Sequence, residues 1–213
     1  MHLLFDLDGT LTDSGPGIVN CVNHALAVLG RSAVAEHEVR GLIGSPLHDI
    51  FARLFGSHDR PLIERAIGAY RDRFNDVGIF ENALYPGIAD ALEALAASGH
   101  TLQVVTAKPE APARRVVEHF RIHQHFVALH GPTLDQPTCD KADLVAAALA
   151  HAGASPNAAV MIGDRKDDVR AARTNGVRAV GAGWGYGTAD ELVAAGAVFV
   201  ACDVAQLLVW IRT

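Results

Sequence analysis

The chain has 213 residues, of which 50% are hydrophobic and 20% are charged, and its formal net charge is −6 at pH 7. This is the composition of a folded globular protein, which excludes disorder as its main state. The negative charge argues against a nucleic acid polymer or an anionic membrane as partner, and three widely spaced cysteines argue against a disulfide framework or a zinc knuckle.

Neither the apolar runs of the chain nor its N-terminal segment indicates a membrane protein. No apolar run reaches the ~18 residues that a membrane span needs. The N-terminal segment MHLLFDLDGT has no basic lead and carries two acids, so it does not have the pattern of a signal peptide. We therefore expect a cytoplasmic protein without a membrane partner.

Short apolar stretches alternate with helical patterns along most of the chain. Strands are predicted at residues 3–5, 102–105, 126–129, 160–162, 178–180 and 197–200, and helices at 88–98, 111–119, 143–151 and 167–175. The strands are continuously apolar, which is typical of a parallel sheet covered on both faces. The alternation predicts an α/β fold with a doubly wound, mostly parallel, Rossmann-like sheet.

Residues 15–81 break this alternation, because their apolar residues follow helical spacing throughout. Helices are predicted from Pro16 to Gly30, at residues 46–55 and at residues 61–75. We therefore expect two domains. An α/β core would contain residues 1–14 and 82–213, and a small all-helical inserted domain would contain residues 15–81.

Two acids follow the first predicted strand. Asp6 ends the run LLF, and Asp8 is two residues further on. In an extended chain, residues two apart share a face, so both carboxylates can reach one site, and Gly9 allows the backbone to turn immediately afterwards. Two carboxylates that close repel each other unless one is protonated or a cation lies between them. Mg²⁺ prefers oxygen ligands of this kind.

Further polar residues follow the other strands. Thr106 ends LQVVT, Asp164 follows VMIG, and Lys141 lies at the expected start of a helix. Because ligands of open parallel sheets bind beyond the carboxyl ends of the strands, we expect these side chains to join the aspartates of the first strand. Carboxylates, a hydroxyl and an ammonium group together indicate a site for a phosphate group and a metal ion.

At each of three places near this site, the sequence leaves two interpretations open. Either Asp167 or Asp168 faces the metal, and Asp168 is favoured because it lies four residues after Asp164. Lys108 is either a phosphate ligand or a surface charge. The segment WGYG at residues 184–187 is predicted to be a turn, whose glycines are either structural or allow a close backbone approach.

The motifs FDLDGTLTDS, the threonine of VVTAKP, Lys141 and VMIGDRKDDV together resemble the haloacid dehalogenase-like superfamily of hydrolases. The segments VRGLIGSPLHDIF and GAGWGYGTADELVAAGAVFV are similar to its phosphoglycolate phosphatase-like branch, whose members carry a helical cap domain. The resemblance covers essentially the whole chain. It implies that residues 15–81 are such a cap.

The resemblance also implies roles for individual residues. Asp6 would be the nucleophile that becomes an aspartyl phosphate, and Asp8 would be the general acid and base. Asp164, Asp6 and the Asp8 backbone carbonyl would hold Mg²⁺, and Asp168 would support this metal site. The expected phosphate-binding residues are Thr106, Lys141, Gly9 and Ala107.

The expected activity is Mg²⁺-dependent hydrolysis of a small phosphate monoester, either phosphoglycolate-like or a nucleoside monophosphate. The cap would act as a lid that excludes water, with residues 41–48 closing over the leaving group. Two alternatives stay open, namely a phosphomutase that passes the phosphoryl group to a sugar and a non-catalytic phosphoacceptor or binding module. The sequence leaves open whether the protein is a monomer or a homodimer.

Overall fold

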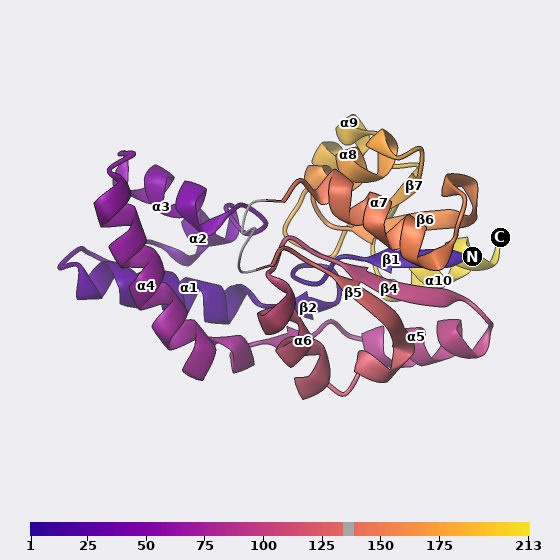
Figure 1. Ribbon diagram of the computed structural model, residues 1–213, viewed down its shortest axis with the longest axis horizontal. Coiled ribbons are helices and arrows are strands. Elements are labelled where there is room, and N and C mark those ends of the chain that lie inside the picture. The colour runs from indigo at the N-terminus through magenta and orange to yellow at the C-terminus, as the bar shows by residue number, and fades with distance from the viewer. Residues whose placement is uncertain (134–138) are drawn as a thin grey trace. The chain divides into compact units, whose positions relative to one another are not determined.

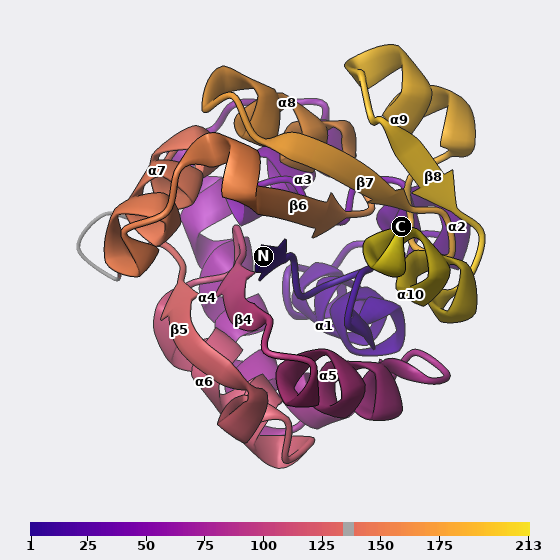
Figure 2. The same ribbon diagram turned by 90° about the vertical axis from the view of Figure 1, so that its right-hand side faces the viewer.

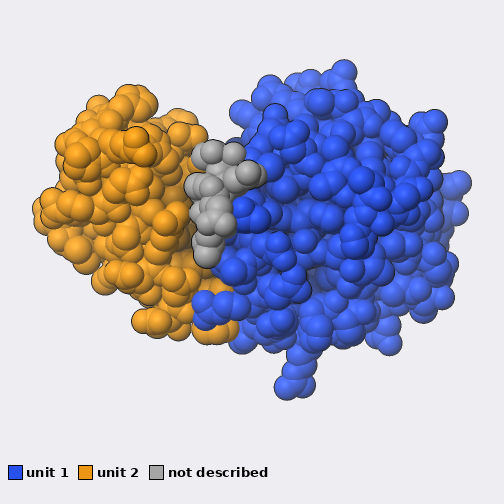
Figure 3. Space-filling view, in the orientation of Figure 1, with its two compact units in different colours: residues 1–13, 84–213 blue, residues 14–83 orange. Residues whose placement is uncertain are grey.

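The computed structural model describes residues 1–133 and 139–213, and the chain divides into two compact units (Figures 1 and 3). Unit 1 consists of Met1–Asp13 and Leu84–Thr213, and unit 2 consists of Ser14–Ala83. No helix among the described residues is long and apolar enough to cross a membrane.

Unit 1 is built on a six-stranded sheet in which every neighbouring pair is parallel. The strand order is β5-β4-β1-β6-β7-β8. The strands are β1 (His2–Phe5), β4 (Thr101–Val105), β5 (Phe126–His130), β6 (Ala159–Gly163), β7 (Arg178–Ala182) and β8 (Phe199–Ala201). The predicted parallel α/β sheet is thereby confirmed, although the last strand begins two residues later than predicted.

The strand register places the ends of the central strands side by side. Phe5 of β1 lies opposite Val104 of β4 and Ile162 of β6. The residues that follow these three strands therefore emerge at one edge of the sheet. This edge is where polar side chains from distant parts of the sequence can meet.

Helices cover both faces of this sheet (Figures 1 and 2). One face carries α7 (Lys141–Ala152), α8 (Lys166–Thr174) and α9 (Ala189–Ala195), and the other carries α5 (Ile88–Ala97), α6 (Glu110–His119) and α10 (Val204–Arg212). The core under the first face includes Val145, Met161, Val169 and Leu192, which are all fully buried. Of these six helices, α9 and α10 were not predicted from the sequence. Two 3-10 turns, His123–His125 and Pro156–Ala158, precede β5 and β6.

Unit 2 is helical, and it has its own apolar core. It contains α1 (Gly15–Val28), α2 (Glu36–Arg40), α3 (Leu47–Phe55), α4 (Arg60–Asp76) and a 3-10 turn at Gly78–Phe80. Phe51 of α3 and Tyr70 of α4 are buried, with ring centroids 6.4 Å apart. The short helix α2 was not predicted. The strands β2 (Thr12–Asp13), in unit 1, and β3 (Ala83–Leu84), where the chain passes from unit 2 back to unit 1, were not predicted either, and they form a separate two-stranded sheet.

Candidate active site

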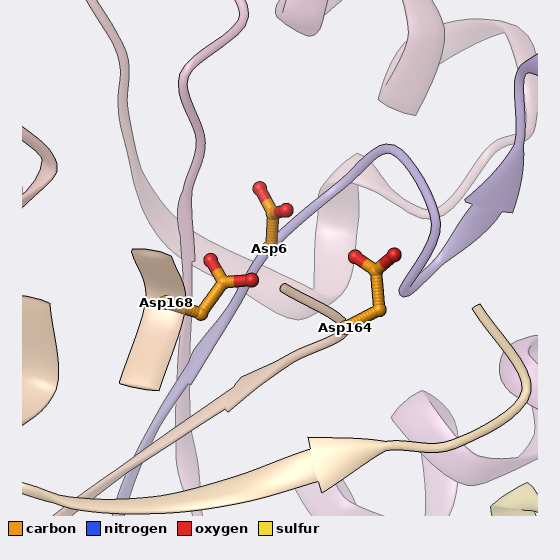
Figure 4. A group of neighbouring side chains, drawn as sticks. All are labelled: Asp6, Asp164 and Asp168. Atoms are coloured by element: carbon orange, nitrogen blue, oxygen red, sulfur yellow. The ribbon is translucent and has the colours of Figure 1, made fainter. Parts of the chain in front are cut away.

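Three buried carboxylates meet at the carboxyl edge of the sheet (Figure 4). Asp6 follows β1, Asp164 follows β6, and Asp168 lies in the first turn of α8. One carboxylate oxygen from each lies within 4.8 Å of the others. The backbone N–H of Asp6 donates to the Ile162 carbonyl at 2.9 Å, which extends the pairing of β1 and β6 to this residue. The sheet therefore brings together acids that are more than 150 residues apart in the sequence.

Lys141 supplies a positive charge to this group. Its Nζ lies 2.9 Å from Asp6 Oδ1 and also contacts Asp168 Oδ1. Lys141 is the first residue of α7, and the Asp140 side chain caps this helix by accepting from the Ala142 backbone N–H at 2.9 Å. Burial lowers the pKa of Lys141, but the charges of Asp168 and Asp6 outweigh it and raise that pKa above its ordinary value.

The acids nevertheless outnumber this one ammonium group. Burial, together with the charge of Asp168, raises the pKa of Asp6 to about 6 and the pKa of Asp164 to about 8. Lys141 opposes both shifts without cancelling them. A buried cluster with surplus negative charge, made only of oxygen ligands, fits a hard divalent cation such as Mg²⁺.

Asp164 is held by two neighbouring segments. Thr10 Oγ1 donates to its Oδ1 at 3.3 Å, and the Tyr186 backbone N–H donates to its Oδ2 at 2.8 Å. Gly9 has a φ of +88°, and a Cβ atom there would overlap the Asp164 carboxylate. The Gly9 N–H donates to the Thr12 carbonyl at 2.8 Å, so in this structure glycine provides space for Asp164, and its N–H already has a partner.

The structure places Asp168, and not its neighbour Asp167, in the cluster. Asp168 is buried, and its Oδ2 accepts from the Arg165 backbone N–H at 2.9 Å. The Asp167 side chain is 59% exposed and lies 3.8 Å from Arg170 Nη1. Gly163 is needed just before this turn, because a Cβ atom there would overlap the Asp168 side chain.

Asp8 does not join the three carboxylates. The chain turns directly after Asp6, because the N–H groups of Leu11 and Thr12 donate back to the Leu7 carbonyl at 2.9 and 3.0 Å. Asp8 instead pairs with Lys108, with 2.6 Å between Asp8 Oδ2 and Lys108 Nζ. The other oxygen, Asp8 Oδ1, is buried without a hydrogen-bond partner among the described residues.

The segment after β4 supplies the remaining predicted residues. Thr106 is buried, and its Oγ1 accepts from the Lys108 backbone N–H at 3.2 Å, which leaves the hydroxyl proton for another acceptor. Ala107 is exposed in the bend between them. Lys108 is a residue whose role the sequence left undecided. The sequence signal that could have placed Lys108 in the site was its position two residues after Thr106 in TAKP.

Comparisons with known proteins agree with these features. A family model described as haloacid dehalogenase-like hydrolase matches residues 3–182. The chain is 40% identical over 206 residues to a protein named 5'-nucleotidase from Pseudomonas aeruginosa, and the matched region covers 97% of this chain and 93% of that protein. It is 30% identical over 213 residues to a phosphoglycolate phosphatase from Pseudomonas putida, covering 97% and 78%.

A relative with a different name is equally similar in sequence. The chain is 40% identical over 188 residues to a protein named tyrosine-protein kinase PtkA from Mycobacterium tuberculosis, covering 88% of this chain and 64% of that protein. Among solved structures, a predicted phosphatase from Clostridium acetobutylicum has a TM-score of 0.92 at 34% identity, covering 99% of this chain and 97% of that one. These similarities confirm the resemblance that the motifs indicated.

Proposed function

Because the chain belongs to the haloacid dehalogenase-like hydrolase family, we propose that it is a Mg²⁺-dependent phosphatase of small phosphate monoesters. The observation that carries this proposal is the meeting of Asp6 with Asp164, Asp168 and the Lys141 ammonium group in one buried site. Bound Mg²⁺, held by Asp6, Asp164 and the Asp8 backbone carbonyl, would screen the nucleophile from the anionic substrate.

Asp6 is the proposed nucleophile. A carboxylate oxygen of Asp6 attacks phosphorus, the bond between phosphorus and the ester oxygen breaks, and an aspartyl phosphate forms. Lys141 stabilises the ionised Asp6 before the attack and binds phosphoryl oxygens during it, and Thr106 donates its hydroxyl proton to another of them.

Asp8 is the proposed general acid and base. It gives a proton to the leaving ester oxygen in the first step, and it takes a proton from the water that attacks the aspartyl phosphate in the second. The products are an alcohol and inorganic phosphate, and Asp6 is regenerated. The ion pair with Lys108 supports this role because it holds the Asp8 side chain in one orientation.

The names of the relatives support two substrate classes, which are nucleoside monophosphates and phosphoglycolate-like esters. A second candidate function is phosphoryl transfer to an acceptor other than water, as in a phosphomutase. The relative named as a tyrosine-protein kinase is the observation that favours it. The lid role of residues 15–81, a cytoplasmic location and a monomeric or dimeric state remain predictions.

The experiment that tests the proposed function measures inorganic phosphate released from nucleoside monophosphates, phosphoglycolate and sugar phosphates, with Mg²⁺ and with a chelator. We expect release that requires Mg²⁺ and that falls by about 10³–10⁶-fold in Asp6→Asn. Asp167→Asn is the matched control, since this exposed aspartate lies outside the cluster. Wild-type protein that releases no phosphate from any ester would contradict the proposal. A phosphorylated sugar formed in place of inorganic phosphate would favour the phosphomutase.

A further inference from the structure

The turn at residues 184–187, here called the WGYG turn, follows β7 and reaches the Asp164 carboxylate. Its Tyr186 N–H occupies Asp164 Oδ2, and Thr10 Oγ1 occupies Asp164 Oδ1 from the segment after β1. Each oxygen thus receives a hydrogen bond from a different part of the chain. Together they set the rotation of the carboxylate, while each oxygen keeps a lone pair for a metal ion.

Two side chains anchor this turn on the segment after β1. Trp184 Nε1 donates to the Thr10 carbonyl at 3.0 Å, and the Tyr186 hydroxyl donates to Asp13 Oδ1 at 2.8 Å. Thr10 therefore contacts both the turn and Asp164. The WGYG turn, the segment from Thr10 to Asp13, and Asp164 form one closed set of hydrogen bonds within unit 1.

The glycines of the turn allow this close approach. A Cβ atom at Gly185 would overlap both Asp164 and the Gly9 carbonyl, and a Cβ atom at Gly187 would overlap the Asp164 carbonyl. Glycine is required at both positions because the backbone of the turn packs directly against Asp164. The two aromatic side chains provide the anchoring that the glycines cannot.

We propose that the WGYG turn orients the metal-binding carboxylate of Asp164, with Trp184 and Tyr186 as positioning residues that act through it. The inference rests on the proposed function, because it takes Asp164 to be a metal ligand. Mg²⁺ demands near-ideal octahedral geometry, so a carboxylate that is free to rotate binds it less tightly. Partners of metal ligands typically contribute about 10–100-fold to metal affinity.

The test compares Tyr186→Phe and Trp184→Phe with the wild type as full-length chains. Each variant keeps an aromatic ring and the glycines but loses one anchoring hydrogen bond. The Kd for Mg²⁺ is measured by calorimetry, and the Kd for Mn²⁺ by electron paramagnetic resonance, both without substrate. We expect each Kd to rise by about tenfold. Trp210→Phe is the matched control, because Trp210 lies in α10 and stacks on Phe199, with ring centroids 6.3 Å apart. This substitution should leave both Kd values unchanged.

Changes at Asp13 distinguish orientation from general damage. Asp13→Asn keeps an oxygen that accepts from the Tyr186 hydroxyl and should bind Mg²⁺ as the wild type does. Asp13→Ala removes this acceptor and should resemble Tyr186→Phe. Because both substitutions break the same bond, the double variant Asp13→Ala/Tyr186→Phe should bind Mg²⁺ no more weakly than the weaker single variant.

The outcomes separate this inference from the function on which it rests. Equal metal affinity in the wild type and in both aromatic variants, with or without a lower melting temperature, would overturn the positioning role and leave the proposed function intact. A wild type that binds neither Mg²⁺ nor Mn²⁺ would overturn the proposed metal site, and the inference with it.

Discussion

Lys108 Nζ lies 2.6 Å from Asp8 Oδ2, and the two side chains are only 8% and 15% exposed. The proposed general acid and base therefore contacts an ammonium group from the segment that follows β4, and β4 is the neighbour of β1 in the sheet. Because both groups are largely shielded from water, this contact fixes the orientation of Asp8 more firmly than a surface ion pair could.

Lys108→Met should lower kcat by at least about tenfold, because Asp8 loses the group that orients it for proton transfer. The decrease should be larger for an alkyl phosphate than for p-nitrophenyl phosphate, whose leaving group needs little protonation. Steady-state kinetics on the two esters measure this difference. Arg114→Met is the control, since it removes an equal charge from an exposed ion pair with Glu110 in α6. An equal loss on both esters would contradict a role through Asp8.

Asp8→Asn should lower turnover by about 10²–10⁴-fold, because an amide cannot donate the proton that the leaving oxygen needs. The buried site should still bind phosphate analogues, since Asp6, Thr106 and Lys141 are unchanged. Thermal unfolding with and without Mg²⁺ and beryllofluoride measures this binding, and it should show the same stabilisation as in the wild type. An unimpaired Asp8→Asn enzyme would remove Asp8 from the mechanism.

Asp168→Asn and its neighbour Asp167→Asn form a matched pair. Asp168 contacts Lys141 and belongs to the carboxylate cluster, whereas the Asp167 side chain is mostly exposed. We expect Asp168→Asn to weaken Mg²⁺ binding by about 10–100-fold and Asp167→Asn to change it less than about twofold. Calorimetric titration with Mg²⁺ measures both. Equal effects would show that the two positions had been wrongly distinguished.

Stabilisation by Mg²⁺ should increase with pH. Without metal, the raised pKa values of Asp164, about 8, and Asp6, about 6, mean that the folded chain retains protons that an unfolded chain has released. The contribution of these two carboxyl groups to the free energy of unfolding should therefore fall as the pH rises from about 4 to about 8. Mg²⁺ replaces these protons, so its affinity should rise over the upper part of this range.

Melting temperatures at pH 6 and pH 8, with and without Mg²⁺, measure this effect. The shift caused by Mg²⁺ should be larger at pH 8. The difference between the two pH values should shrink in Asp164→Asn, whose amide does not titrate. A shift that is independent of pH in the wild type would contradict proton displacement at this cluster.

Much of the site could be predicted from the sequence because parallel strands end at a common edge. Continuous apolar runs predict such strands, and Asp6, Thr106 and Asp164 follow three of them directly. Asp168 could be favoured over Asp167 from helical spacing alone. These are local patterns. Because parallel strands end at the same edge of the sheet, residues that follow different strands come close to one another in the fold.

Other contacts depend on how the chain folds after each strand. The extended chain assumed for Asp6 and Asp8 ends in a turn back onto the Leu7 carbonyl, and the carboxylates that cluster with Asp6 are those of Asp164 and Asp168. The partner of Asp8 is Lys108, whose proximity depends on the bend after β4. Contacts of this kind join segments about 100 residues apart, and no periodicity in either segment encodes them.

Local patterns predict the parallel sheet, the helical segment at residues 15–81 and the set of acids that follow the strands, because apolar periodicity and strand ends are local properties of the chain. Three features needed the folded chain, namely which oxygens share one buried space, which lysine meets which aspartate, and the hydrogen bonds of Trp184 and Tyr186 to the segment after β1. These contacts depend on turn geometry and on side-chain packing between distant segments, which hydropathy does not specify.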